Sequence, residues 1–390
     1  MVFMLLMALN TAVAQNTHYV SLAGTNNYPY TNWADSATNI QWAMDASAAG
    51  DTVLVSNGTY NLTNMVTINP SVILQSVNGK DLTFINGNYP NVTNRCIFIN
   101  DGGVLDGFTL TNGYAKNDDI LGRAGGVYCT ANTYVKNCMI EHNYATSRGG
   151  GVYMDGGMVS NCVLSHNSSL QEGGGEYGGG NLWNCMIVSN SSVSSSSGGI
   201  QGATLRNCTI IGNSAAVNAG GVGWSDAYNC MIVGNTAASL GGGARQGNLY
   251  NCTIVGNNAN QFQGGTSEGI LFNCIVYFNT SPNNDTRNYG GSSFTNSCTI
   301  PAQAGWSTSN TTNDPMFIAN GSDYGTNHIA GNYRLKANSP CINAGTNYSW
   351  MTDSGVRNRD MDGRQRIRYG TVDMGAYEAI YNGTIYRLGF

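Results

Sequence analysis

A cysteine returns eight times along this 390-residue chain at intervals of 22 to 24 residues, and an asparagine directly precedes the first seven of them. A second asparagine follows each of those seven cysteines after five residues, and a glycine cluster precedes most of the units. A fixed period of this length is typical of a solenoid, in which each repeat stacks on the previous one. The eight cysteines are Cys138, Cys162, Cys185, Cys208, Cys230, Cys252, Cys274 and Cys298.

Each repeat is built from strand-length runs rather than from helices. The runs are rich in Ile, Val and Thr, are separated by Gly, Asn and Ser, and show no 3.6-residue period. A strand–turn–strand unit of about 23 residues that repeats in register predicts a parallel β-helix, here with roughly ten coils. We therefore expect an all-β solenoid of stacked, single-chain coils.

The apolar residues fall into rows that predict the interior. One apolar residue stands three positions before each of the first seven cysteines and another stands two positions after it. Equivalent residues of stacked coils lie about 4.8 Å apart, so we expect both rows and the cysteines to face inward. Parallel Cβ vectors suit disulfides poorly, which favours cysteine as a small buried hydrophobic residue. The pairing of Cys96, Cys129 and Cys341, which lie off the row, is not determined by the sequence.

The asparagine before each cysteine is expected at a bend between two strands, where its amide can bond to the asparagines above and below.

The chain itself divides into parts with different compositions. The four parts are residues 1–14, a secretory signal; residues 15–62, an N-terminal cap; residues 63–300, the β-helix; and residues 301–390, an exit loop with a C-terminal cap over residues 337–381. The signal is apolar and ends in Ala-Val-Ala, which predicts cleavage before Gln15 and export.

A short helix is expected in the N-terminal cap, over residues 37–48. Ile40, Ala43 and Met44 recur there at helical spacing, just before a strand-length run. An amphipathic helix at this place can cover the open end of a solenoid, which otherwise exposes apolar rows and unpaired strand edges.

Several motifs resemble known families of bacterial β-helix proteins. Residues 49–55 and 104–110, with the Asn-Cys-x-Ile-x-x-Asn units, resemble right-handed β-helix proteins of the pectin-lyase-like superfamily. The glycine rhythm also resembles polymorphic outer-membrane-protein repeats. Residues 339–345, 360–366 and 372–378 resemble the choice-of-anchor Q domain of secreted β-helix proteins. The resemblance implies a right-handed helix and a secreted or cell-surface location, whereas the superfamily's activities range from lyases and hydrolases to adhesins.

Composition excludes some partners. Only 10% of the residues are charged and the formal net charge is −5, so the basic footprint of a nucleic-acid-binding protein is missing. No apolar run reaches the length of a membrane-spanning helix. Together with these exclusions, the resemblance to secreted β-helix proteins implies extracellular polysaccharide or another surface polymer as the partner.

Candidate catalytic residues form two groups. Polysaccharide lyases of the superfamily need a basic side chain and a cation, often Ca²⁺. Asp118, Asp119 and Arg123 are the densest local charge cluster, and they share one loop. His142 and His166 both follow a cysteine by four residues, so they should stack on adjacent coils. The alternative for the histidines is a turn position that tolerates any polar residue, because later coils place Ser or Gly there.

A row of aromatic residues is the candidate ligand-binding surface. Two positions before successive cysteines stand Trp183, Arg206, Tyr228, Tyr250 and Phe272. If the preceding row faces inward, this row faces outward, and its rings can offer sugars a flat platform. The alternatives are that the rings stabilise the sheet by stacking with one another, or that a loop covers them.

Three carboxylates near the C-terminus suggest a calcium site without completing its motif. Asp360, Asp362 and Asp373 lie among glycines, but the spacing of an EF-hand is absent. The alternative is that Asp360 forms structural ion pairs with Arg364 or Arg366. Ca²⁺ binding therefore stays open, as does the presence of any other cofactor.

The function expected from these features is that of a secreted or cell-surface, non-catalytic protein that contacts extracellular polysaccharide. The first alternative is a polysaccharide lyase or glycoside hydrolase, which would show convergent charges in a groove, or two carboxylates about 5 to 10 Å apart. The second alternative is a structural or adhesin stalk, which needs no binding face. The sequence decides neither the ligand nor whether the chain is an enzyme.

Overall fold

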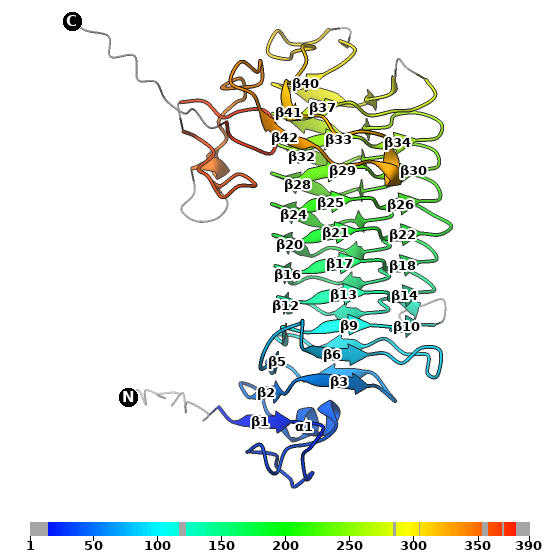
Figure 1. The fold of residues 1–390 in the computed structure, drawn as a ribbon, viewed down its shortest axis with the longest axis vertical. Coiled ribbons are helices and arrows are strands. Elements are labelled where there is room, and N and C mark those ends of the chain that lie inside the picture. The colour runs from blue at the N-terminus through cyan, green and yellow to red at the C-terminus, as the bar shows by residue number, and fades with distance from the viewer. Residues whose placement is uncertain are drawn as a thin grey trace, which may run out of the picture.

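The chain forms a right-handed parallel β-helix of about ten turns (Figure 1). This computed structural model describes residues 15–116, 122–283, 286–303, 305–352, 358–368 and 370–379. The expected signal, residues 1–14, lies outside the described residues, and so do Asp118 and Asp119. None of the described helices is long and apolar enough to cross a membrane.

Each coil passes through up to four parallel sheets, of 10, 12, 11 and 7 strands, in that order along the chain. The 12-stranded sheet comprises β1 (Thr17–Val20), β2 (Thr52–Val55), β5 (Ile73–Ser76), β8 (Val104–Asp106), β12 (Tyr134–Lys136), β16 (Met158–Ser160), β20 (Asn181–Trp183), β24 (Thr204–Arg206), β28 (Asp226–Tyr228), β32 (Asn248–Tyr250), β36 (Ile270–Phe272) and β39 (Ser293–Thr295). The 11-stranded sheet comprises β3 (Gly58–Asn61), β6 (Thr83–Asn86), β9 (Thr109–Thr111), β13 (Met139–Glu141), β17 (Val163–Ser165), β21 (Met186–Val188), β25 (Thr209–Ile211), β29 (Met231–Val233), β33 (Thr253–Val255), β37 (Ile275–Tyr277) and β40 (Cys298–Thr299).

The other two sheets complete the coil. The 10-stranded sheet comprises β4 (Val66–Ile68), β7 (Ile97–Ile99), β11 (Val127–Cys129), β15 (Val152–Met154), β19 (Glu176–Gly178), β23 (Ile200–Gln201), β27 (Val222–Gly223), β31 (Ala244–Arg245), β35 (Thr266–Ser267) and β38 (Tyr289–Gly290). The 7-stranded sheet comprises β10 (Tyr114–Ala115), β14 (Tyr144–Ala145), β18 (Ser168–Ser169), β22 (Ser191–Ser192), β26 (Ser214–Ala215), β30 (Thr236–Ala237) and β34 (Asn258–Ala259). Strands are only two to four residues long, so the register of each coil on the next sets which side chains face inward.

The predicted interior is confirmed. The apolar rows before and after each cysteine are buried, and so are the cysteines themselves. All eleven cysteines are free thiols. The Sγ of Cys208, for example, donates to the carbonyl oxygens of Arg206 (3.3 Å) and of Leu182 on the preceding coil (3.5 Å). Cysteine therefore acts as a small buried side chain whose weak donor is satisfied by the backbone.

The asparagine ladder differs from the prediction, because it is made by the second asparagine of each repeat. Asn213 is buried, accepts from the backbone N–H of Asn190 (2.9 Å) and donates from Nδ2 to the Oδ1 of Asn235 (2.9 Å). The asparagine before each cysteine does lie at the bend, with a positive φ of 50–56°. That left-handed backbone favours asparagine over other residues and turns the side chain outward. Only a few of these outer amides bond to each other, as Asn184 does to Asn161 (3.4 Å).

Both ends of the solenoid are covered. Helix α1 (Ile40–Ala46) closes the first coils, is capped by the Oδ1 of Asn39, and buries the three predicted apolar residues. At the other end Trp306 packs on Tyr289 and Phe294 of the last coils (ring centroids 6.5 and 5.9 Å). The residues that follow β40, the last strand of the solenoid, therefore cover that end.

The described residues of 314–379, here called the C-terminal segment, lie along the side of the last coils instead of over their end (orange and red in Figure 1). The segment contains the antiparallel pair β41 (Phe317–Ala319) and β42 (Asn332–Leu335), and the short helices η3 (Gly325–Asn327) and η4 (Ser349–Met351). Its apolar side chains pack on outer residues of the 11-stranded sheet. That cluster includes Phe317, Tyr333, Leu335 and Met374 of the segment with Met231, Val233, Val255 and Ile275 of the sheet.

Candidate functional site

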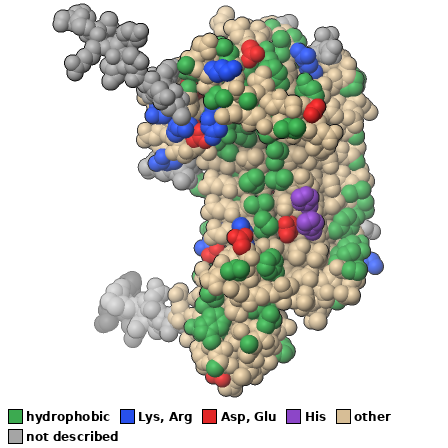
Figure 2. Space-filling model, viewed as in Figure 1, with side chains coloured by type: hydrophobic (Ala, Val, Ile, Leu, Met, Phe, Trp, Pro, Cys, Tyr) green, Lys and Arg blue, Asp and Glu red, His purple; other side chains and the backbone are tan. Residues whose placement is uncertain are grey.

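The 11-stranded sheet has an uncovered stretch, here called the open strip, formed by the outer residues of β13, β17, β21 and β25. Its apolar members include Met139, Val163 and Met186, and Met186 is 47% exposed. On the same row one coil beyond the strip, Met231 is only 3% exposed, because the C-terminal segment covers it. Figure 2 shows hydrophobic side chains along the middle of this face, next to two histidines.

Asparagines of the bends border the open strip on the side of the 12-stranded sheet. These are Asn161, Asn184 and Asn207. Their equivalents in the covered coils hold the C-terminal segment. Asn229 donates to the carbonyl oxygen of Arg359 (2.9 Å), Asn251 to that of Asp373 (3.0 Å) and Asn273 to that of Thr346 (2.8 Å). The bend asparagines therefore hold the C-terminal segment on the covered coils and face outward beside the open strip.

The two histidines border the opposite side of the open strip. The rings of His142 and His166 stack with centroids 5.1 Å apart and planes 4° from parallel, as the sequence predicted. The Nδ1 of His142 lies 3.9 Å from a carboxylate oxygen of Glu141. Both histidines have positive φ (54° and 53°), and Ser189 and Gly212 adopt the same conformation on the next coils. The turn therefore dictates the backbone, while the two exposed imidazoles remain available for chemistry.

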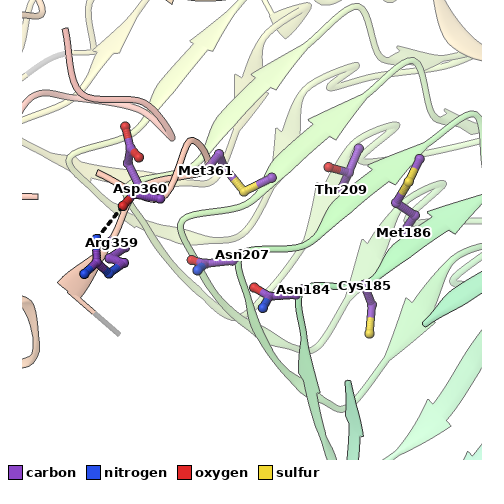
Figure 3. Close-up of a pocket in the computed structure, with 9 residues that line it drawn as sticks. Asn184, Cys185, Met186, Asn207, Thr209, Arg359, Asp360 and Met361 are labelled. Carbon is purple, nitrogen blue, oxygen red and sulfur yellow. Dashed lines mark hydrogen bonds between the residues drawn. The ribbon is translucent and has the colours of Figure 1, made fainter. Parts of the chain in front are cut away.

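A pocket of about 340 Å³ lies where the open strip meets the C-terminal segment (Figure 3). Its lining comprises Asn184, Cys185, Met186, Asn207, Thr209, Arg359, Asp360, Met361 and Gly363. The Nη1 of Arg359 donates to the carbonyl oxygen of Gly363 (2.7 Å). In the close-up the side chains of Asn207 and Asn184 lie to the right of Arg359, and Met361 extends toward Thr209.

The carboxylates of Asp360, Asp362 and Asp373, the predicted calcium ligands, accept hydrogen bonds from other groups of the protein. Asp360 accepts the backbone N–H groups of Arg364 (2.7 Å) and Glu378 (2.8 Å), and Asp373 accepts that of Ala379 (2.7 Å). Asp362 forms ion pairs with two arginines, and the hydrogen bond from Arg334 lowers its pKa. Over the described ranges, no group of three or more His, Cys, Asp or Glu side chains is arranged to hold a metal. These contacts match the structural ion-pair alternative and give no support to the calcium interpretation.

The predicted aromatic row faces outward, but its rings face one another. Tyr228 and Tyr250 stack at 4.7 Å and 5°, and Tyr250 and Phe272 at 4.9 Å and 9°. The guanidinium of Arg206 lies 4.0 Å above the ring of Tyr228, and half-buried Trp183 is the register partner of Arg206. Rings from Tyr348 and Trp350 of the C-terminal segment contact the edges of the column. Tyr228 and Tyr250 thus lack the free faces that a sugar platform requires, and both structural alternatives apply to them.

A second column, which sequence reasoning missed, runs along the outer face of the 10-stranded sheet. Its rings are those of Phe98, Tyr128, Tyr153 and Tyr177, with centroids 5.0 to 5.5 Å apart. Arg95, Arg123 and Arg148 each lie over a tyrosine ring at 4.8 to 5.0 Å. We call this the Tyr–Arg column. The sequence does contain the spacing that predicts this column, because the tyrosines recur after 25 and 24 residues and Arg123 and Arg148 are 25 residues apart.

Hydrogen bonds tie the Tyr–Arg column together. Tyr128 donates to Asp155 (2.6 Å), and Arg123 donates to the hydroxyl of Tyr153 (3.0 Å). Burial raises the pKa of Tyr128 to about 12, and Asp155 adds to the shift. Arg123, predicted to act with Asp118 and Asp119, is thus engaged on this face. The tyrosines are largely buried, so the column reads as a stabilising stack of rings and cations.

One carboxylate lies inside the solenoid. Glu176 occupies an inward position of the 10-stranded sheet, between Val152 and Ile200 on adjacent coils. It is fully buried, and neither carboxylate oxygen has a hydrogen-bond partner among the described residues. Burial raises the pKa of this carboxyl well above its usual range, so it is held neutral. It lies away from the open strip and takes no part in that site.

No protein-family profile matches the chain, and no curated protein sequence matches it. Among solved structures, the chain is similar to the pectate lyase Pel9A, with a TM-score of 0.57 and 17% identity over 95% of this chain and 98% of that one. It is also similar to XylC in complex with xylose (TM-score 0.42, 10% identity, 72% and 75% of the chains). The PL6 family alginate lyase AlyGC matches with a TM-score of 0.35 and 11% identity over 66% and 45%. The likeness to the pectate lyase shows a shared β-helix fold.

Proposed function

We propose that this chain is an exported β-helix protein that binds extracellular polysaccharide along its open strip without cleaving it. Export rests on the sequence of residues 1–14 and on the resemblance of the C-terminal segment to a choice-of-anchor Q domain. Polysaccharide is favoured as the partner because the pectate lyase that shares the fold acts on one. The strip offers the chemistry that a sugar chain needs, an apolar floor with polar groups along both sides.

The row of bend asparagines is the observation that carries the proposal. In the covered coils this row already binds backbone carbonyl groups from three separate turns of the C-terminal segment through side-chain amides. In the open coils Asn161, Asn184 and Asn207 stand at the same bends, beside the apolar floor. An amide supplies both donors and acceptors, which suits the hydroxyl groups of a sugar. The geometry that binds a polypeptide in one half therefore suits a polysaccharide in the other.

The lack of paired carboxylates on the strip favours binding over hydrolysis. Glycoside hydrolysis requires two carboxyl groups about 5 to 10 Å apart across the bond that breaks. Among the outer residues of β13, β17, β21 and β25, Glu141 supplies the one carboxylate. The strip therefore lacks the second acid within the strands that form it.

A polysaccharide lyase is the second candidate, and the histidine pair favours it. An exposed imidazole can abstract the proton next to a uronate carboxylate, and the second imidazole and Glu141 lie beside that of His142. In that case His142→Gly with His166→Gly would abolish the formation of unsaturated chain ends. Glycine keeps the positive φ that both positions require, so folding is preserved.

The proposal is tested by measuring binding and turnover on the same panel of uronate and neutral oligosaccharides, with and without Ca²⁺. Asn184→Gly with Asn207→Gly removes two amides but keeps the left-handed bends, and we expect roughly tenfold weaker binding. Asn132→Gly is the matched control, because Asn132 also has positive φ (55°) but lies on the turn between β11 and β12. Equal affinity in both variants contradicts binding at the strip. Release of unsaturated ends or reducing sugar by the unmodified protein contradicts the non-catalytic role.

A further inference from the structure

The pocket of Figure 3 continues the open strip under the C-terminal segment. Met186 and Thr209 belong to both, because they are outer residues of β21 and β25 and also line the pocket. One coil further, Met231 is buried beneath the segment. A sugar chain that lies along the strip therefore runs into the pocket and must end there.

The polar groups of the pocket are unequally engaged. Asp360 is 1% exposed, accepts three backbone N–H groups and lies 3.7 Å from the guanidinium of Arg364. The guanidinium of Arg359 makes one hydrogen bond among the described residues, to the carbonyl oxygen of Gly363, and none of the described carboxylates lies within 4.0 Å of it. A guanidinium has five N–H donors, so Arg359 retains donors for a ligand. The side-chain amide of Asn207 makes no hydrogen bond to the described residues.

The pocket lining carries one basic and one acidic side chain, Arg359 and Asp360, and more arginines lie nearby in the sequence of the C-terminal segment. The formal net charge is −5, but Arg359, Arg364, Arg366 and Arg368 fall within ten residues of the C-terminal segment. Of these, Arg366 is fully buried and paired with Glu378, whereas Arg359 lines the pocket. The cation that a ligand meets at the end of the strip is therefore Arg359.

We infer that this pocket is a subsite for the terminal sugar of a bound chain, and that Arg359 pairs there with an anionic group, a carboxylate or a sulfate, on that sugar. The inference rests on the proposed function of the open strip. Arginine binds planar anions through two parallel hydrogen bonds, which fixes both position and orientation. The amides of Asn184 and Asn207 and the hydroxyl of Thr209 meet the sugar hydroxyls. Met186 and Met361 contact the apolar face of the ring.

Three matched probes test the anion preference by calorimetry on the full chain. They are an α-1,4-linked oligogalacturonate, the same oligomer after reduction of its carboxyl groups, and a sulfated form of the reduced oligomer. We expect Arg359→Gln to weaken binding of the preferred anionic oligomer roughly tenfold and to leave the neutral oligomer unchanged. Arg287→Gln, on an exposed arginine outside the pocket, is the control and should change neither. Comparing the carboxylated with the sulfated probe identifies the anion.

Binding stoichiometry tests the role of the chain end. A terminal subsite predicts that a long polygalacturonate binds a number of protein copies set by its ends, so the number does not grow with chain length. Many copies per long chain, or an unchanged ratio of anionic to neutral affinity in Arg359→Gln, would overturn the subsite while the strip still stands. If none of the three oligomers binds the unmodified protein, the proposed function fails as well. A melting temperature equal to that of the unmodified protein shows that Arg359→Gln folds.

Discussion

The coils up to β25 and the coils from β28 onward have the same interior and opposite exteriors. Inside, both halves carry the buried cysteine, the apolar rows and the asparagine ladder, which run without interruption from the coil of Cys138 to that of Cys274. Outside, Met186 of the first half is 47% exposed, and Met231 of the second is 3% exposed under the C-terminal segment. Parallel stacking fixes only the inward residues, so the outward residues of a solenoid are free to bind either a segment of the same chain or another molecule.

The two aromatic columns teach the same lesson on a smaller scale. In both, rings on adjacent coils stack face to face, so the faces are used within the protein. Arginines lie over rings in both columns, and Tyr348 and Trp350 of the C-terminal segment also contact the edges of the column on the 12-stranded sheet. A repeated row of aromatic residues in a solenoid therefore indicates rings that stack on one another. Such a row can form a platform for a ligand only where the face of a ring stays uncovered.

The largest effect is expected where the C-terminal segment is anchored. Arg366 is fully buried and donates to Asn229 (2.9 Å), to Glu378 (2.9 Å) and to the carbonyl oxygen of Gly375 (2.6 Å). Burial raises the pKa of Glu378 to about 8 although Arg366 lowers it, so removal of Arg366 raises this pKa further and leaves Glu378 protonated at neutral pH. We therefore expect Arg366→Met to lower the free energy of unfolding by about 3 kcal/mol, near the lower limit for breaking a buried pair.

Chemical denaturation and limited proteolysis measure this loss. The C-terminal segment should become sensitive to protease while the coils up to β25 stay protected, because those coils do not depend on it. Arg359→Met is the control, since Arg359 makes one backbone hydrogen bond in the same segment. Loss of protection in both halves at once would contradict their independence.

The second largest effect is expected from Glu176, a carboxyl group buried between apolar residues of the interior, because it makes the stability of the fold depend on pH. The native state holds its proton more tightly than the unfolded chain does, because burial raises the pKa. Its contribution to stability is therefore complete below the unfolded pKa of about 4.3 and is lost as the pH rises above it, by up to about 1.4 kcal/mol per pH unit. Glu176→Gln should remove this pH dependence, and Glu176→Val should raise the melting temperature at pH 7.

The control for this experiment is Glu172→Gln. Glu172 pairs with Arg148 at 3.0 Å near the surface, where an ion pair contributes little, so the variant should keep the pH dependence. Denaturation at pH 5 and pH 8 measures the difference. A melting temperature that responds to pH equally in Glu176→Gln and in the unmodified protein would show that this carboxyl is not held neutral.

Periodicity explains which features the sequence could predict. The buried rows and the stacking of His142 on His166 follow from the register of the coils, the helix with Ile40, Ala43 and Met44 follows from its 3.6-residue spacing, and all were predicted correctly. The same register places Tyr128 over Tyr153 and Glu176 between Val152 and Ile200, but glycine-rich spacing between those residues hid the row. The C-terminal segment has no period, and it is held through backbone carbonyls and single side chains. Its position beside the last coils was therefore beyond pattern reasoning, and so was the pocket that it forms.

The smallest expected effect is the loss of stability on replacing a bend asparagine by glycine. It tests the difference between the covered and the open coils directly, because the same residue type stands at equivalent bends in both. Asn251 donates to the carbonyl oxygen of Asp373 in the C-terminal segment (3.0 Å), whereas Asn184 in the open half bonds only weakly to Asn161 (3.4 Å). Glycine preserves the positive φ at both bends, so each substitution removes only the amide. The Asn251 side chain also accepts from the Nδ2 of Asn273 (3.2 Å), so we expect Asn251→Gly to cost about 2 kcal/mol, two net hydrogen bonds, and Asn184→Gly to change stability by less than about 0.5 kcal/mol. Denaturation midpoints measure both. An equal cost at the two positions would show that the open bends already have a partner, and the amides there would then not be available to a sugar chain.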